Sequence, residues 1–287
     1  MNGFENIIQA VEIYERSLID HKKIPSVSAL AQRTGYSPYH FTRLFSSVVG
    51  IGPKEYMQGR LLTHMLDELR ATSKTLALLS EQYGYVDYAS FSRAFKNRFG
   101  YSPREARDQQ LSIFQGRVEI FKPDSRKEII PCLPQPQIMS LQPFVLSGIA
   151  FFIGNETKSF HSQWNTFMQA EDQIEGVKEP RKFHQYSSWL EEGELPGLSV
   201  LCALEVVENT IQKNVFTTRI VEGGDYLQFL HEGDISQISQ TYRYIYGTWF
   251  ASQEIQPRGC WEFQRYSQDG NTVEIFIPVK TGILLPN

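Results

Sequence analysis

Phe91-Ser-Arg-Ala-Phe-Lys-Asn-Arg-Phe-Gly-Tyr-Ser-Pro103 is the stretch that decides the fold of the first third of this chain. Its three phenylalanines recur at the spacing of one helix face, whereas Arg93 and Lys96 fall on the opposite side. Gly100 then ends the pattern, because glycine adopts the left-handed C-cap conformation at little cost. The stretch therefore predicts a short helix with a buried aromatic face and a basic exposed face.

The same pattern occurs once before, 50 residues upstream. Residues of this earlier unit match their counterparts in the second unit as follows: Phe41, Arg43, Phe45, Gly50 and Pro53 pair with Phe91, Arg93, Phe95, Gly100 and Pro103. Before the helix the offset is 49, because Gly35-Tyr36 returns as Gly84-Tyr85, so the second turn carries one extra residue. Self-similarity of this size predicts one supersecondary unit used twice.

Each unit is predicted to be a helix-turn-helix. Short amphipathic segments at 26–34 and 75–83 stop at a glycine, and the next helices begin at the capping residues Ser37 and Asp87. Helix, glycine-containing turn and helix is the arrangement that DNA-binding proteins use. Between the units, 54–72 reads as one helix about 28 Å long at 1.5 Å per residue. Such a helix would hold two recognition helices about one DNA turn apart.

The exposed faces of the second helices hold the candidate DNA-binding residues. They are Tyr39, Thr42 and Arg43 in the first unit, and Tyr88, Ala89, Arg93 and Lys96 in the second. An arginine fork can bind guanine or phosphate, and small neighbours allow close approach to the groove. Arg43 alone would be typical of a solvated surface, and its recurrence as Arg93 favours a role in DNA binding. Tyr39 could equally pack against the neighbouring helix.

Charge is divided unequally along the 287 residues. Residues 1–107 hold 14 Lys and Arg against 10 Asp and Glu, a net charge of +4, whereas 108–287 hold 14 against 22, a net charge of −8. A basic half next to an acidic half supports a DNA-facing N-terminal region. No apolar run approaches the ~20 residues that span a bilayer, and the charged N-terminus does not read as a signal peptide, so we expect a cytoplasmic protein.

Cysteines and histidines predict no metal site. Cys132, Cys202 and Cys260 are odd in number and far apart, and the six histidines lack metal-ligand spacing. Reduced, partly buried thiols are therefore expected.

The rest of the chain reads as a second domain. We expect a DNA-binding domain at 1–108, a proline-containing connection at 109–136 with one strand at Arg117–Phe121, and an α+β domain at 137–287. Apolar runs predict strands at 144–153, 199–207, 225–231 and 273–279, and helices at 160–174 and 235–252. This order predicts two β-α-β-β copies.

Aromatic residues and two glutamates mark a candidate ligand site in this domain. The aromatic candidates are Trp164, Tyr226, Phe229 and Trp249, with Trp189, Tyr246, Trp261 and Phe276 also able to line a cavity. Glu262 and Glu274 stand among apolar residues, where a carboxylate is costly unless it is paired, for instance with a cationic aromatic ligand. Two alternatives stay open: Glu274 could point outward by strand alternation, and the aromatic residues could simply form core.

The two helix-turn-helix units resemble the AraC/XylS family of transcription regulators. The motifs that carry the resemblance are Ala31–Ser37, Phe41–Phe45 and, above all, Phe91–Pro103. The resemblance implies that Tyr39, Thr42 and Arg43 face one groove of DNA, and that the next groove is faced by Tyr88, Ala89, Ser90 and Arg93. Some relatives have a longer polar side chain at the position of Ala89, which predicts a relaxed or different preference at the second half-site.

The C-terminal domain resembles GyrI-like effector-binding domains. The motifs are Glu222–Tyr226, Phe229–Gly233, Tyr242–Trp249, Trp261–Tyr266 and Glu274–Pro278. A double helix-turn-helix followed by this domain is similar to the layout of Rob-like regulators. In multidrug-sensing relatives a glutamate at the position of Glu262 faces a cationic ligand, so the resemblance favours Glu262 over Glu274.

Together these observations predict a DNA-binding transcription regulator controlled by a small ligand. Its expected partners are double-stranded promoter DNA, a small-molecule effector and, as in relatives, RNA polymerase, and no membrane is expected. We expect no enzymatic activity, hence no catalytic residue, and no cofactor. The alternatives are a ligand-sequestering protein and a hydrolase in which Glu262 acts as general base, as in some stand-alone GyrI-like domains.

Overall fold

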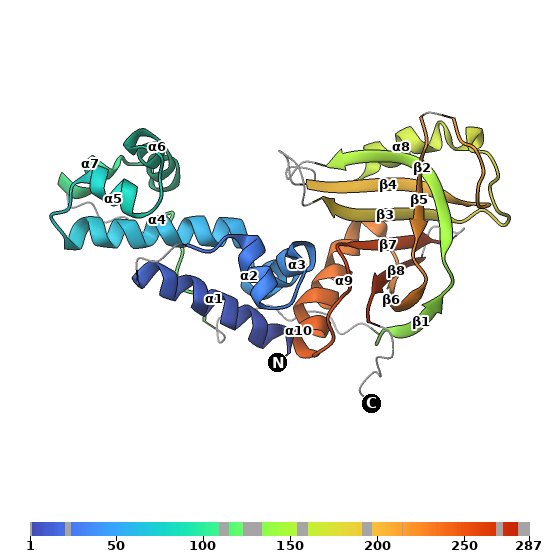
Figure 1. Ribbon diagram of the computed structural model, residues 1–287, viewed down its shortest axis with the longest axis horizontal. Helices are drawn as coiled ribbons and strands as arrows, with labels where there is room; N and C mark the ends of the chain where they lie inside the picture. The colour runs from blue at the N-terminus through green and yellow to red at the C-terminus, as the bar shows by residue number, and fades with distance from the viewer. Residues whose placement is uncertain are drawn as a thin grey trace. The chain divides into compact units, whose positions relative to one another are not determined.

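The computed structural model describes residues 2–20, 24–108, 115–122, 134–153, 160–190, 197–213, 215–267 and 272–280. The chain divides into two compact units, 3–128 and 129–287 (Figure 1). Helices make up the secondary structure of the first unit, and the second unit is built on one antiparallel sheet. The predicted fold class, tandem helix-turn-helix followed by α+β, is confirmed.

The helices of the N-terminal unit are α1 (Gly3–Ile19), α2 (Val27–Arg33), α3 (Pro38–Val49), α4 (Pro53–Ala71), α5 (Leu76–Gln82), α6 (Tyr88–Phe99) and α7 (Pro103–Asp108). The five helices from α2 to α6 lie where the sequence pattern predicts them, and α1 and α7 precede and follow them. The side chains of the N-cap residues of α2, α3, α5 and α6 each accept a hydrogen bond from a backbone N–H in the first turn; these residues are Ser26, Ser37, Thr75 and Asp87. Gly50 and Gly100 end α3 and α6 with φ of 91° and 82°, in the left-handed region that favours glycine.

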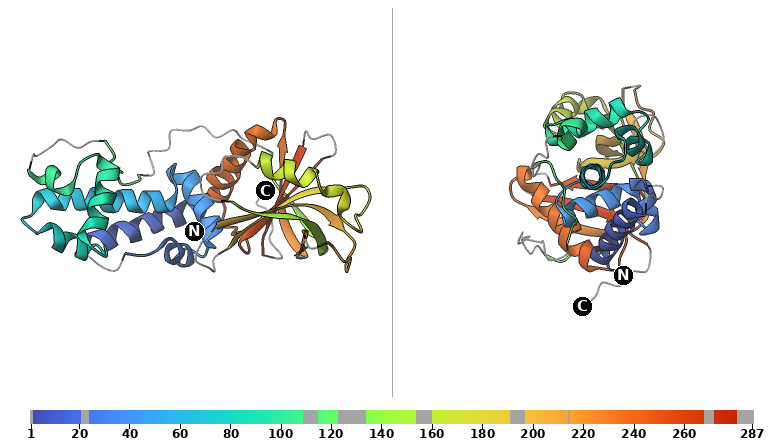
Figure 2. Two further views of the ribbon diagram at one scale, coloured as in Figure 1. Left: turned by 90° about the horizontal axis from the view of Figure 1, so that it is seen from above. Right: turned by 90° about the vertical axis from the view of Figure 1, so that its left-hand side faces the viewer.

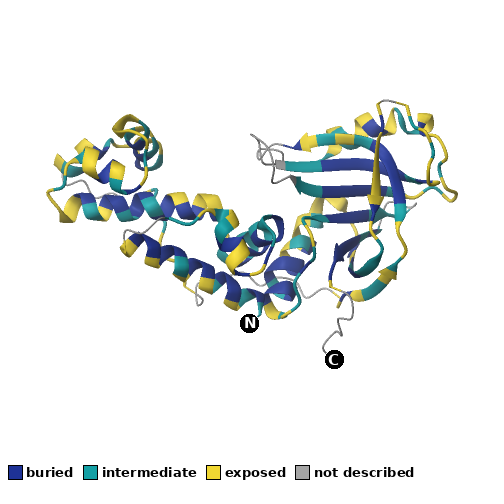
Figure 3. Cartoon of the chain, in the orientation of Figure 1, coloured by how far each residue is buried: buried dark blue, intermediate teal, exposed yellow. Residues whose placement is uncertain are grey.

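The long helix α4 supplies the core of the second helix-turn-helix. Leu62, Met65, Leu66 and Leu69 of α4 pack with Leu79 of α5 and with Phe91, Phe95 and Phe99 of α6. The phenylalanines of α3 are buried as well. Figure 3 shows that buried residues follow one side of the helices while exposed residues follow the other. The predicted core face of both recognition helices is therefore confirmed, whereas Tyr39, which the pattern placed on the exposed face of α3, is buried.

Residues 115–122 form no strand, so the strand predicted at Arg117–Phe121 is wrong. This segment lies along α4 instead, and helix side chains satisfy its backbone groups. The N–H of Val118 donates to Thr63 Oγ1 at 3.0 Å, the carbonyl of Val118 accepts from Arg60 Nη1 at 2.8 Å, and the N–H of Phe121 donates to the Tyr56 hydroxyl at 3.2 Å. The apolar alternation predicted a strand, but in the helical unit the segment has no neighbouring strand to pair with.

Gly59 of α4 allows this close approach. A Cβ atom at Gly59 would lie 2.4 Å from Val118 Cγ2. At the other end of the segment, the Gly116 carbonyl accepts from Arg98 Nε of α6 at 2.6 Å. The segment thereby contacts the connecting helix α4 and helix α6 of the second helix-turn-helix, and the residues that the sequence assigned to the connection are in part a component of the N-terminal unit.

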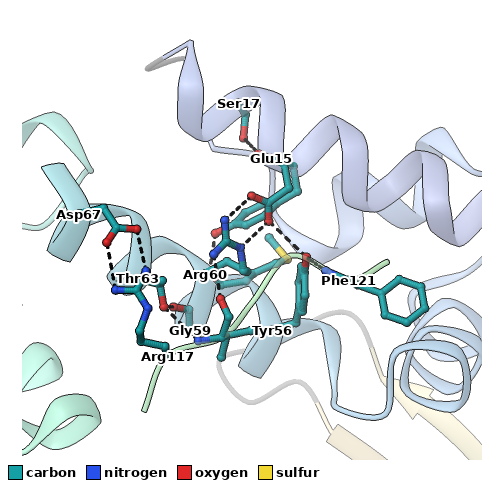
Figure 4. A network of polar contacts seen from close by, with 12 residues as sticks. Glu15, Ser17, Tyr56, Gly59, Arg60, Thr63, Asp67, Arg117 and Phe121 are labelled. Carbon is teal, nitrogen blue, oxygen red and sulfur yellow. Dashed lines mark hydrogen bonds and ion pairs between the residues drawn. The ribbon is translucent and has the colours of Figure 1, made fainter. Parts of the chain in front are cut away.

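A buried ion pair ties α1 to α4 beside this segment (Figure 4). Arg60 donates from Nε to Glu15 Oε1 at 2.8 Å and from Nη2 to Glu15 Oε2 at 2.7 Å, and both side chains are about one-tenth exposed. The Tyr56 hydroxyl donates to Glu15 Oε1 at 3.2 Å. Because Arg60 also binds Val118, one guanidinium joins α1, α4 and the segment that follows α7.

The C-terminal unit contains an eight-stranded antiparallel sheet among the residues that the structure describes. The strands are β1 (Gln137–Leu141), β2 (Phe144–Ile153), β3 (Phe183–Leu190), β4 (Gly197–Val206), β5 (Thr217–Val221), β6 (Gly224–Glu232), β7 (Trp261–Tyr266) and β8 (Thr272–Pro278). Their order is β1-β6-β8-β7-β3-β4-β2-β5. The sheet thus has two halves, each a β-α-β-β unit, which meet where β3 pairs with β7. Each half also receives at its outer edge the strand that precedes the other half, since β1 pairs with β6 and β5 pairs with β2.

Each half places its helical segment on the same face of the sheet. These segments are α8 (His161–Met168) with η2 (Glu171–Gln173) in the first half, and η3 (Ile235–Gln237), α9 (Ile238–Tyr244), the π-helical turn η4 (Ile245–Trp249) and α10 (Phe250–Ser252) in the second. Figure 2 shows α8 in yellow-green and α9 in orange on one side of the strands. Strands β3 and β7, in the centre of the sheet, therefore lie between the two helical segments.

Of the strands, the sequence located β2, β4, β6 and β8. It did not locate β3 and β7, because polar residues interrupt their apolar pattern, nor the edge strands β1 and β5. The helix predicted at 160–174 is shorter than expected, since α8 ends at Met168 and is followed by a 3₁₀ turn.

Candidate nucleic-acid interface and ligand site

The outward face of α6 is open to solvent. Tyr88, Ala89, Arg93 and Lys96 are exposed and Ser90 is half-buried, while Phe91, Phe95 and Phe99 point into the core. Asp87 caps the helix, and its carboxylate accepts from the Ser90 N–H at 2.7 Å. This face presents a guanidinium and an ammonium group beside small side chains, a chemistry suited to a DNA groove.

The corresponding face of α3 is more enclosed. Thr42 and Arg43 are half-buried and Tyr39 is buried. The guanidinium carbon of Arg43 lies 4.9 Å from the centroid of the Tyr39 ring, and that ring meets the His40 ring edge-on at 5.0 Å. Tyr39 is therefore buried, and its ring contacts the Arg43 guanidinium and the His40 ring of the same helix.

A cluster of buried polar side chains lies on the helix-bearing face of β3 and β7. Gln185 and Ser187 of β3 stand directly opposite Gln264 and Glu262 of β7 in the strand register, and all four side chains are at most 5% exposed. Burying polar groups is unfavourable unless each finds a partner. Four of them in the centre of a sheet, where apolar residues would pack well, are typical of a binding site and not of a core.

Aromatic residues from both helical segments bind this polar cluster. The Tyr246 hydroxyl donates to Glu262 Oε2 at 2.9 Å, Gln264 Nε2 donates to the Tyr242 hydroxyl at 2.7 Å, and Trp164 Nε1 donates to Gln185 Oε1 at 3.1 Å. Tyr246 lies in the π-helical turn, a distortion that is frequent at functional sites.

Aromatic rings lie on two sides of the cluster. On the α8 side the ring centroids of Trp164 and Tyr266 are 4.9 Å apart, and on the α9 side Tyr242 and Tyr246 are stacked with planes 8° apart. A carboxylate next to aromatic rings can offer charge attraction and cation–π contacts to one and the same ligand.

Glu262 and Trp164 are the sequence-predicted ligand residues that the structure brings together. Glu274 lies on the opposite face, where it forms an ion pair with Arg265, its direct cross-strand neighbour, and accepts from Gln228. Strand alternation, the alternative reading for Glu274, therefore describes it correctly.

The other predicted aromatic residues are part of the core. Tyr226 packs on the opposite face with Phe263 and Phe276. Phe229 of β6 packs against Trp249 and Phe250 of the second helical segment. Tyr246, which the sequence named as an additional candidate, hydrogen-bonds to Glu262.

Sequence reasoning missed the two glutamines, the serine and two tyrosines of this cluster: Gln185, Ser187, Gln264, Tyr242 and Tyr266. The available signal was the interruption of apolar alternation in the two strands that pair at the centre of the sheet. That signal is readable only after the pairing of β3 with β7 is known.

The described ranges contain neither a membrane-spanning helix nor a cluster of metal-binding side chains. No helix there is long and apolar enough to cross a membrane. No group of three or more His, Cys, Asp or Glu residues that could hold a metal ion occurs in that part of the chain. Cys202 and Cys260 form no disulfide bond within the described residues, and Cys132 lies outside those residues.

Family models match both units. A helix-turn-helix domain model matches residues 30–109, and the model of the integron-associated effector-binding protein matches 137–279. The protein is a transcription regulator with an AraC-type DNA-binding domain. The regulator is 23% identical to the transcriptional regulator Rob of Salmonella typhimurium, over 91% of each chain.

Two further comparisons cover one unit each. The regulator is 28% identical to the multiple antibiotic resistance protein MarA of Escherichia coli, over 34% of this chain and 75% of MarA. The integron cassette protein of Vibrio cholerae resembles the C-terminal unit with a TM-score of 0.40 and 17% identity, over 51% of this chain and 96% of that one. The two family models together give the regulator an AraC-type helix-turn-helix domain followed by a GyrI-like effector-binding domain.

Proposed function

We propose that α3 and α6 enter successive major grooves of promoter DNA and that Arg43 and Arg93 contact base edges there. The observation that carries the proposal is the exposed face of α6, where Arg93 stands between small side chains above a fully buried aromatic core. Lys96 on the same helix is placed to contact phosphate. RNA polymerase is the expected protein partner once the regulator is bound at a promoter.

Arg93→Ala is expected to weaken binding to a cognate promoter by about 1–3 kcal/mol, roughly 5- to 150-fold, because one arginine–guanine contact is lost. The cognate sequence is obtained first, by selecting duplexes bound by the full-length protein from a random pool at ~150 mM salt, where unspecific binding is weak. Affinity for that duplex is then measured by fluorescence anisotropy. Arg16→Ala, at an exposed arginine of α1, is the matched control. Equal affinities of Arg93→Ala and the unaltered protein would refute the role of Arg93.

We further propose that the cluster around Glu262 binds an aromatic cation that acts as the effector. The buried carboxylate supplies the charge, Trp164, Tyr242 and Tyr246 supply ring faces, and the two glutamines orient polar groups of the ligand. Binding changes DNA affinity or promoter activation only if the ligand stabilises one state of the protein over another.

Glu262→Gln is expected to weaken binding of tetraphenylphosphonium, used here as an aromatic monocation, by about 2 kcal/mol or more, roughly 30-fold. Titration calorimetry gives the affinity. Glu274→Gln is the matched control, because that glutamate lies on the opposite face of the same sheet and should leave affinity unchanged. If the unaltered protein does not bind the cation, or if both variants lose affinity equally, the effector proposal is wrong.

The two alternatives from the sequence predict different outcomes in the same experiments. A ligand-sequestering protein would bind the cation but select no DNA motif. A hydrolase would turn over reactive esters in a way that Glu262→Gln abolishes. A selected motif together with ligand binding and no turnover supports the regulator.

A further inference from the structure

Val86 directly precedes the second recognition helix, and its side chain is exposed to solvent. It is 97% exposed, in the turn between α5 and α6, directly before the N-cap Asp87. It belongs to the stretch in which the second unit is one residue longer than the first, where Tyr36 is followed at once by the N-cap Ser37. A β-branched apolar residue is unusual in such a turn, and packing in the folded protein does not account for it.

Along the exposed face of α6, apolar side chains at the N-terminal end give way to a charged side chain one turn later. Ala89 and Arg93 are four residues apart, share one side of the helix and are both exposed. Val86 lies at the N-terminal end of the same helix. In helix-turn-helix proteins the N-terminal residues of the recognition helix contact base edges. This end of α6 therefore offers methyl groups to the DNA, and Arg93 follows one turn further on.

The N-cap residue indicates which part of the DNA this end would face. A helix N-terminus ordinarily attracts phosphate through its free N–H groups. In α6 the Asp87 carboxylate already accepts the Ser90 N–H, and this hydrogen bond lowers the pKa of Asp87, so the N-terminus carries a negative charge at neutral pH. The corresponding cap of α3 is the neutral Ser37. The negative charge of Asp87 thus disfavours a phosphate at the start of α6. The uncharged base edges of the groove are therefore the part of the DNA that this end of the helix would contact.

We propose that Val86, supported by Ala89, recognises the 5-methyl group of a thymine in the second half-site. Apolar contact with this methyl group is the means by which aliphatic side chains distinguish thymine in the major groove. The inference rests on the proposed two-groove binding and predicts one further recognised base. The half-site read by α6 contains a thymine next to the base that Arg93 contacts, and the first half-site has no equivalent requirement.

Deoxyuridine substitution tests the contact directly, because uracil pairs like thymine and lacks only the methyl group. In the selected duplex each thymine of the second block is replaced in turn by deoxyuridine. One replacement should weaken binding of the full-length protein by about fourfold, the value for one buried methyl group. With Val86→Ser the same replacement should have no effect. Because Val86 is almost fully exposed, this variant is expected to fold normally.

The outcomes separate this inference from the proposed function. Ile220→Ser, at an exposed apolar residue of β5, is the control and should keep the sensitivity to deoxyuridine. A two-block motif without a thymine in the second block, or a deoxyuridine effect that persists in Val86→Ser, overturns the role of Val86 and leaves two-groove binding intact. Failure to select any motif overturns the proposed function itself. If Val86→Ser alters neither affinity nor deoxyuridine sensitivity but abolishes promoter activation, Val86 contacts RNA polymerase and not thymine.

Discussion

Arg60→Met is expected to destabilise the N-terminal unit by about 3–5 kcal/mol, because it leaves the buried Glu15 carboxylate without its guanidinium. Of the hydrogen bonds to that carboxylate, the one from the Tyr56 hydroxyl remains. The Val118 carbonyl loses its donor in the same substitution. Urea unfolding followed by far-ultraviolet circular dichroism measures the loss in the helical unit.

Tryptophan fluorescence is a built-in control for this experiment. The four tryptophans, Trp164, Trp189, Trp249 and Trp261, all belong to the C-terminal unit. Their unfolding transition should therefore not respond to Arg60→Met. The double variant Glu15→Leu with Arg60→Met should recover most of the stability, since well-packed apolar side chains can replace a buried ion pair. A loss below about 1 kcal/mol for Arg60→Met would show that water screens the pair.

Acid is expected to weaken the C-terminal unit through His184. Both ring nitrogens of His184 lack a hydrogen-bond partner within the part of the chain that the structure describes, and the ring packs against Phe144 and Phe263. Burial, with the positive charges of Arg265 and Lys182, lowers the pKa of His184 from 6.5 to about 3. The folded protein therefore keeps this imidazole neutral at pH values where the unfolded chain binds a proton.

The direction of the pH effect follows from this lowered pKa. The stability is complete above about pH 6.5 and is lost as the pH falls towards 3, with about 2 kcal/mol lost between pH 7 and pH 5. Urea unfolding of the unaltered protein, followed by tryptophan fluorescence at pH 7, 6 and 5, should show this loss. His184→Phe should remove it, because phenylalanine fills the aromatic surroundings without a titrating group. His161→Gln, at an exposed histidine of α8, controls for the number of histidines. An equal decrease in His184→Phe and the unaltered protein would contradict the assignment to His184.

The helical unit could be predicted from sequence in most of its detail because its signals are local. A helix face repeats within four residues, the capping serines, threonine and aspartate act on their own first turn, and the glycines end helices by their own conformation. The identical spacing of Phe41 and Phe91 relative to Arg43 and Arg93 separated core from surface without knowledge of any contact.

The polar cluster around Glu262, the candidate ligand site, was predicted only in part because strand alternation does not say which face a helix covers. Glu262 and Glu274 look alike in sequence, yet Glu274 is neutralised by Arg265 across the sheet while Glu262 meets Tyr246 from a helix. Gln185 and Gln264 read as interruptions of two strands until the register places them opposite each other. Tyr226 and Phe229 were chosen for their aromatic character, and the packing assigns them to core.

The amino-acid sequence was sufficient for what depends on near neighbours along the chain: two helix-turn-helix units, their caps, their buried and exposed faces, and the family to which the regulator belongs. Tertiary structure decided which distant residues meet. It placed residues 115–122 on α4 in place of a strand, joined Glu15 to Arg60 across 45 positions, and gathered the polar cluster between α8 and α9. Contacts between residues that are far apart in sequence produce no periodic pattern in the sequence. They can be identified only once the pairing of the strands and the packing of the helices are known.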